Sequence, residues 1–123
     1  MSSKRHKTKR FIAHAAAIAM AMSTPLSHAN VSCVGPIAYL GADQAGNVVV
    51  AVGGTGINVI CSTTTQGNNQ ANTQACKMFY ATLLSAQISG HSVQIYYNDP
   101  ALTACSQIAS WSTQPSAYFV NPM

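Results

Sequence analysis

The sequence has 123 residues, of which only 7% are charged, with six Lys or Arg against two Asp or Glu. Five of the six basic residues stand between positions 4 and 10, so the chain beyond residue 29 keeps Lys77 against Asp43 and Asp99, a formal charge of −1. Nucleic acids and anionic membranes bind to basic patches on proteins. A surface with one Lys and no Arg has no such patch, which excludes both classes of partner.

Residues 1–29 have the three regions of a secretory signal peptide. Basic residues are followed by an apolar run from Phe11 to Met22, and Pro25 ends that run. Ser27 and Ala29 place small side chains at the −3 and −1 positions of a signal-peptidase site. We predict cleavage after Ala29, a secreted or periplasmic location, and a single mature domain of residues 30–123. A retained basic amphipathic anchor is the alternative.

The first half of the mature chain shows short apolar runs separated by turn residues. Strands are predicted at 37–42, 48–52 and 57–61, with turns at 43–47 and 53–56. The run 48–52 is too apolar to be solvated on both faces. The polar run Ser62 to Gln70 predicts a surface loop.

A helix that passes directly into a strand is predicted between Asn72 and Asp99. Asn72 or Thr73 can cap its start, and Gly90 suits the left-handed position after its end. The predicted core-facing stripe consists of Cys76, Phe79, Tyr80, Leu83, Leu84 and Ile88. The following strand, 93–97, alternates with period two, which sends Tyr97 to the core face and Tyr96 to the other.

A last strand is predicted at 106–112, with a short extension at 117–120. The order is then three strands, one helix and two strands, which is the order of an OB-fold: a five-stranded, partly open barrel with a helix between strands 3 and 4. A ferredoxin-like α+β domain would need a helix between early strands, where the sequence shows only turns.

Four cysteines remain in the mature chain: Cys33, Cys61, Cys76 and Cys105. An even number in a small exported protein predicts two disulfides, for which three connectivities exist. We favour Cys61 with Cys76, across the polar loop, and Cys33 with Cys105. A metal site is disfavoured because no Cys-x-x-Cys pair is present and His91 is the only mature histidine, so no metal or cofactor is expected.

Catalytic groups are sparse, and we do not expect an enzyme. Asp43 and Asp99 fall in separate turns, and no Gly-x-Ser-x-Gly motif supports a triad with His91. Tyrosines combined with many amides and hydroxyls suit carbohydrate, although several aromatic residues are also candidates for the core. Alternation along 93–97 brings at least one of Tyr96 and Tyr97 to the surface.

The run from Cys76 through FYATLLSAQISGHSVQIYYNDP resembles the B subunit of subtilase cytotoxin and related pentameric toxin B subunits. That resemblance implies an OB-fold, a ring of five subunits and binding of sialylated glycans at the cell surface. It places the sugar-contacting Tyr of the family on Tyr97, whereas the family's Ser before the first-strand Gly falls on Val34. A catalytic A subunit is not revealed by this chain.

Two hypotheses follow. The first is a secreted, homo-oligomeric glycan-binding module of the toxin B type, with Tyr97 and Tyr96 as its site. The alternative is a small, disulfide-stabilised OB-like protein of the periplasm or envelope that binds a protein partner.

Overall fold

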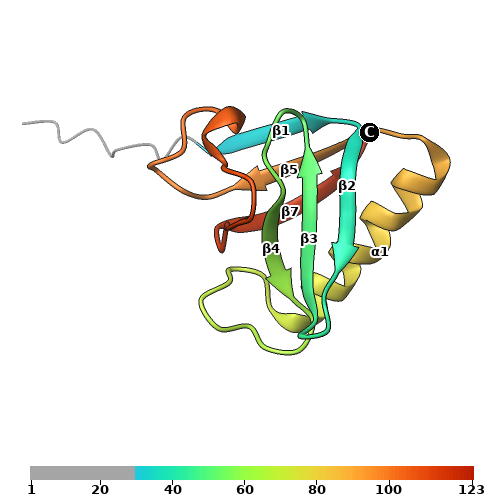
Figure 1. The fold of residues 1–123 in the computed structure, drawn as a ribbon, viewed down its shortest axis with the longest axis vertical. Helices are drawn as coiled ribbons and strands as arrows, with labels where there is room; N and C mark the ends of the chain where they lie inside the picture. The colour runs from blue at the N-terminus through green and yellow to red at the C-terminus, as the bar shows by residue number, and fades with distance from the viewer. Residues whose placement is uncertain (1–29) are drawn as a thin grey trace, which may run out of the picture.

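The computed structural model describes residues 30–123, so the predicted signal peptide lies outside the described part (Figure 1). The described chain is mainly β with one helix, as predicted. Its elements are β1 (Val31–Gly35), β2 (Ile37–Ala42), β3 (Asn47–Val52), β4 (Asn58–Ser62), α1 (Thr73–Ser89), β5 (Val93–Tyr97), the 3₁₀ turn η1 (Cys105–Gln107), β6 (Ser112–Thr113) and β7 (Ala117–Pro122).

The strands form two sheets that cross each other. The first has the order β1-β5-β7 and is antiparallel, and the second has the order β2-β3-β4-β6, in which β4 and β6 run parallel. Figure 1 shows β1, β5 and β7 running across β2, β3 and β4, with α1 along one side, where it packs against β7, β2 and β4. Only Pro36 separates β1 from β2, so one nearly continuous segment supplies an edge strand to each sheet.

The helix begins and ends where the sequence predicts. The Asn72 side-chain oxygen accepts a hydrogen bond from the backbone N–H of Ala75 at 2.8 Å, which satisfies one of the free donors of the first turn. Gly90 closes the helix with φ at 71°, a left-handed conformation that glycine adopts without steric cost.

The core-facing side of α1 differs from the predicted stripe. Cys76, Leu83 and Ala86 are buried, whereas Leu84 is 37% exposed and Ile88 is 78% exposed. Ile88 stands twelve residues after Cys76, and at about 100° per residue that offset turns it roughly 120° away from the Cys76 direction. The inclusion of Leu84 and Ile88 in the stripe was therefore wrong, because small Ala86 occupies the inward position instead.

Both favoured disulfides are confirmed. Cys33 is joined to Cys105 and Cys61 to Cys76, with sequence separations of 72 and 15 residues. In the chain-entropy model such loops stabilise the fold by about 4 and about 3 kcal/mol. The first bond ties β1 to η1, and the second ties the end of β4 to the first turn of α1, so both join elements of the hydrophobic core.

One strand prediction is wrong, and one strand was not predicted. Residues 106–112 do not form a strand: the segment holds the last two residues of η1 and a loop, and only Ser112 joins a two-residue strand. A local hydrogen bond supports the 3₁₀ turn, since the backbone N–H of Thr103 donates to Gln107 Oε1 at 2.7 Å. The strand β1 was not predicted.

Within residues 30–123, no helix combines the length and the hydropathy that a membrane span needs.

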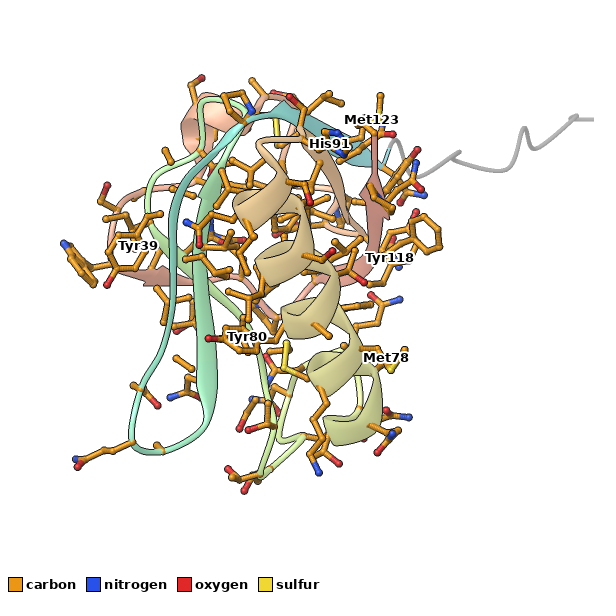
Figure 2. All side chains as sticks on the ribbon, turned by 90° about the vertical axis from the view of Figure 1, so that its right-hand side faces the viewer. Tyr39, Met78, Tyr80, His91, Tyr118 and Met123 are labelled. Atoms are coloured by element: carbon orange, nitrogen blue, oxygen red, sulfur yellow. A yellow bond between two sulfur atoms is a disulfide. The ribbon has the colours of Figure 1, made fainter. Side chains whose placement is uncertain are left out.

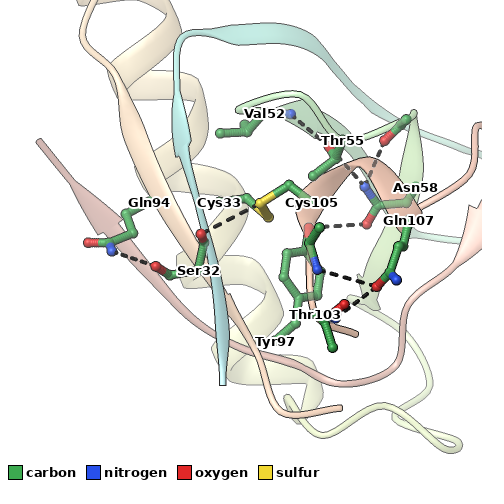
Figure 3. Close-up of a disulfide and its surroundings, with 12 residues drawn as sticks. Ser32, Cys33, Val52, Thr55, Asn58, Gln94, Tyr97, Thr103, Cys105 and Gln107 are labelled. Atoms are coloured by element: carbon green, nitrogen blue, oxygen red, sulfur yellow. Dashed lines mark hydrogen bonds between the residues drawn. A yellow bond between two sulfur atoms is a disulfide. The ribbon is translucent and has the colours of Figure 1, made fainter. Parts of the chain in front are cut away.

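A buried amide links the two sheets (Figure 3). Asn58 on β4 is fully buried, and its Nδ2 donates to the carbonyl oxygens of Val50 at 3.1 Å and Gly56 at 2.9 Å. Its Oδ1 accepts a hydrogen bond from the hydroxyl of Tyr97, on β5 of the other sheet, at 3.3 Å. Asn58 thus connects β3, the turn before β4 and the opposite sheet.

Burial of Tyr97 gives the fold a specific alkaline weakness. Burial raises the pKa of the Tyr97 hydroxyl to about 12 from 10.0, and the Asn58 hydrogen bond opposes part of that rise. The folded state therefore holds this proton more tightly than the unfolded state does. The corresponding free energy of unfolding, on the order of 2–3 kcal/mol, is present below pH 10 and is lost between about pH 10 and 12.

We predict that Tyr97→Phe removes this alkaline loss of stability. The variant should be less stable than the parent at neutral pH, by about 1–3 kcal/mol, because Asn58 Oδ1 loses its buried donor. Its stability should then fall less between pH 10 and 12. Denaturant unfolding at a series of pH values measures both effects, with Tyr118→Phe as the matched loss of one phenol. Equal alkaline slopes for Tyr97→Phe and the parent would contradict the assignment.

Candidate functional site

The outer face of the second sheet carries an apolar surface where a solvated sheet would carry polar residues. Val48, Val50 and Ile60 point into the core, and alternation sends Val49 and Val59 to the opposite face. Val49 and Val59 are cross-strand neighbours, and both are only half-buried. An apolar face that is open to solvent on a small domain indicates a binding surface.

A hollow of about 260 Å³ lies on this face. Its floor is formed by the outward side chains of β3 and β4, and one of its walls is aromatic. Among the residues that line the hollow are Tyr39, Gly41, Asp43, Val59, Trp111 and Ser112.

Tyr39 and Trp111 form the aromatic wall. Their ring centroids are 6.1 Å apart and their planes meet at 74°, so the edge of one ring meets the face of the other. Tyr39 lies over Gly41, whose added Cβ would stand 3.5 Å from the Tyr39 ring. Trp111 is 73% exposed and Tyr39 is 40% exposed. The two rings therefore offer an open corner to a ligand.

The backbone of Trp111 is strained. Its φ is 60°, and it is the only non-glycine residue between 30 and 123 with a positive φ. A bulky side chain in this conformation costs on the order of 1–3 kcal/mol and is found mainly at functional sites. Folding gains little from the ring itself, because most of its surface stays in water. Strain together with exposure favours a role in binding.

Close backbone packing holds Trp111 in this conformation. The N–H of Gly56 donates to the Ile108 carbonyl oxygen at 2.8 Å, and the N–H of Trp111 donates to the Ile57 carbonyl oxygen. A Cβ on Gly56 would lie 2.3 Å from the Ser110 backbone nitrogen, so only glycine permits this approach. The segment 108–111 is thereby fixed against the start of β4.

The only charged side chain that lines the hollow is Asp43, in the turn between β2 and β3. Its Oδ1 accepts hydrogen bonds from the backbone N–H groups of Ala45 and Asn47, each at 2.9 Å, and its Oδ2 accepts from Asn47 Nδ2 at 2.8 Å. The Asn47 side chain, followed by its backbone N–H, holds the pKa of the Asp43 carboxyl below its usual value. Asp43 is therefore an ordered anion at neutral pH.

The residues predicted as the site do not lie in this hollow. Tyr97 is fully buried and its hydroxyl is engaged by Asn58, so its side chain serves the core in the described chain. Tyr96 is half-buried on the outer face of the other sheet, where its ring packs 5.5 Å from Phe119 and 6.1 Å from Tyr118. Figure 2 shows Tyr39 and Tyr118 on opposite sides of the molecule.

Sequence reasoning missed Trp111 and Tyr39 as a pair. Their positions are 72 residues apart, and Trp111 was assigned to a strand that does not form. The apolar run 48–52 was the available signal, because it is too apolar for both faces of that strand to be solvated. Between residues 30 and 123, no three His, Cys, Asp or Glu side chains gather closely enough to hold a metal ion.

No protein-family model, curated protein or solved structure matches the chain.

The position of Trp111 should depend on Gly56. We predict that Gly56→Ala lowers the free energy of unfolding by about 1–3 kcal/mol and changes the fluorescence of Trp111, because the added methyl group displaces the backbone at 108–110. Gly54→Ala is the control. Its Cβ would meet nothing within 4 Å, so it adds only the cost of a left-handed alanine. Identical Trp111 emission in Gly56→Ala and the parent would contradict this dependence.

Proposed function

We propose that the mature chain is a secreted glycan-binding module and that its site is the hollow beside Tyr39 and Trp111. The observation that carries the proposal is the exposed Trp111, held in a strained conformation next to a second ring above an apolar floor. The faces of aromatic rings carry negative partial charge and attract the C–H face of a sugar. Asp43, Ser112 and the Tyr39 hydroxyl supply polar groups for sugar hydroxyls.

The architecture is proposed to be an OB-fold. The connectivity of the strands supports it. β1 and β2 act as one bent strand that contributes to both sheets, and α1 stands between β4 and β5. The last segment pairs with β4 through β6 and with β5 through β7. This order agrees with the toxin B subunits that the sequence resembles. Two disulfides fit the oxidising compartment to which the predicted signal peptide would direct the chain.

We predict that Trp111→Gly weakens glycan binding without lowering stability. Glycine relieves the backbone strain of about 1–3 kcal/mol, which offsets its own entropic cost of about 0.5–1 kcal/mol. Loss of the ring should weaken binding at least about tenfold. The measurement is a glycan array read beside the melting temperature, with Phe119→Ala as the matched loss of an exposed aromatic side chain on the other sheet.

Different outcomes separate the competing sites. Binding that survives Trp111→Gly but is lost in Phe119→Ala or Tyr96→Phe would move the site to the face around Tyr96. A parent protein that binds no glycan but captures a protein partner through Trp111 would favour the alternative hypothesis.

A homo-oligomer is proposed as the functional form, a pentamer by the resemblance. Its support is the outward face of α1, where Met78, Leu84 and Ile88 expose apolar side chains. Single sugar sites are weak, near the millimolar range, and several sites on one assembly raise avidity by about 10²–10⁴. An assembly would therefore make a shallow hollow useful at a cell surface.

Light scattering on the mature protein should give about five times the subunit mass. Ile88→Glu should dissociate the assembly, because it places a charge in the apolar contact, and the mass should fall to that of one subunit. Gln87→Glu is the control, since it adds the same charge at an exposed neighbouring position. A monomeric parent at tens of micromolar would contradict the oligomer.

A further inference from the structure

Two polar side chains of the hollow, Asp43 and Ser112, can only accept hydrogen bonds from a ligand. A carboxylate offers about four acceptor positions, and three of those of Asp43 are occupied by its own turn, which leaves one on Oδ2. The Ser112 hydroxyl donates its hydrogen to the Ala109 carbonyl oxygen at 2.6 Å, so its oxygen can only accept from a ligand. The Tyr39 hydroxyl and the Trp111 indole N–H are the side-chain donors that line the hollow.

Asp43 and Ser112 therefore favour ligand groups that donate hydrogen bonds. Each sugar hydroxyl brings one O–H donor, which Asp43 or Ser112 can accept. A carboxylate or sulfate group brings acceptors alone, and these find no partner on Asp43 or Ser112.

The charge of the hollow also favours a ligand without a carboxylate or sulfate group. Asp43 is its only charged residue, and no Lys, Arg or His lines it. Sialic acid and sulfated sugars carry a negative charge that a protein normally pairs with Arg or Lys. In this hollow that charge would meet the exposed Asp43 carboxylate, which repels it in a salt-dependent way.

The size of the hollow limits how much of a glycan it can hold. Its volume of about 260 Å³ lies below the range of about 300–1,000 Å³ that is usual for drug-sized ligands. The corner formed by Tyr39 and Trp111 also places the two rings nearly perpendicular, so only one ring at a time can lie flat against a sugar. One sugar ring at the end of a chain suits this shape.

Resting on the glycan-binding function proposed above, we infer that the hollow selects a terminal, uncharged pyranose and rejects sugars that carry a carboxylate or sulfate group. The pyranose stacks its C–H face on Trp111 and donates hydroxyls to Asp43 Oδ2 and Ser112 Oγ. This specificity differs from the sialylated glycans that the resemblance to subtilase cytotoxin implies.

The test compares two immobilised glycans that differ only at their end: one that terminates in a galactose or glucose ring, and the same glycan extended by sialic acid. The mature parent protein should bind the uncharged end roughly tenfold or more tightly at low salt, and the ratio should narrow as salt screens the repulsion. Asp43→Asn should also narrow the ratio, whereas Asp99→Asn, the same charge change in another turn, should leave it unchanged.

Failure of this inference can be told apart from failure of the proposed function. Equal or tighter binding of the sialylated glycan, still lost in Trp111→Gly, would overturn the specificity while keeping the site. Binding of neither glycan, nor of any other on an array, would overturn both. If Asp43→Asn loosens its turn, the test uses the parent protein alone and measures how salt changes its preference for the uncharged glycan. A binding ratio between the two glycans that does not change with salt would contradict the role of Asp43.

Discussion

The buried amide of Asn58 is the interaction on which the rest of the structure depends. It binds β3 through the Val50 carbonyl oxygen, the turn before β4 through the Gly56 carbonyl oxygen, and the opposite sheet through the Tyr97 hydroxyl. Removing it would leave several buried polar groups without partners, at about 1–3 kcal/mol each. The same amide fixes Gly56, and Gly56 in turn holds the segment that ends at Trp111. The core and the candidate site are therefore connected by one short series of hydrogen bonds.

The candidate site lowers stability locally, and the fold offsets that cost elsewhere. Trp111 stays strained and exposed, and the valines beneath it face solvent, so none of them contributes the full burial that its side chain could give. A domain of fewer than 100 residues has little core to spare. Two disulfides restrict the unfolded chain and compensate for this deficit. Such a balance, with strain at the surface and covalent restraint in the core, is expected where function opposes stability.

Much of the fold follows from local pattern, and the site does not. The strands 37–42 and 93–97 and the caps at Asn72 and Gly90 were predictable, because period-two alternation and helix capping are local effects. The segment 106–112 was not, because its conformation depends on Gly56 and Cys33, which are distant in sequence. Alternation did place Tyr97 on the core side of its strand, where the structure has it. The corner between Tyr39 and Trp111 arises only when β2 and β6 come to lie in the same sheet.

Trp111 is the only tryptophan of the chain, so its fluorescence reports on the proposed site alone. The most direct test is to titrate the mature parent protein with a glycan that it binds and to follow Trp111 emission and its quenching by a water-soluble quencher. Binding at the hollow should shift the emission to shorter wavelength and shield the ring from the quencher, and both changes should saturate with the binding curve. A glycan that binds while the emission and quenching of Trp111 stay unchanged would contradict the assignment of the site.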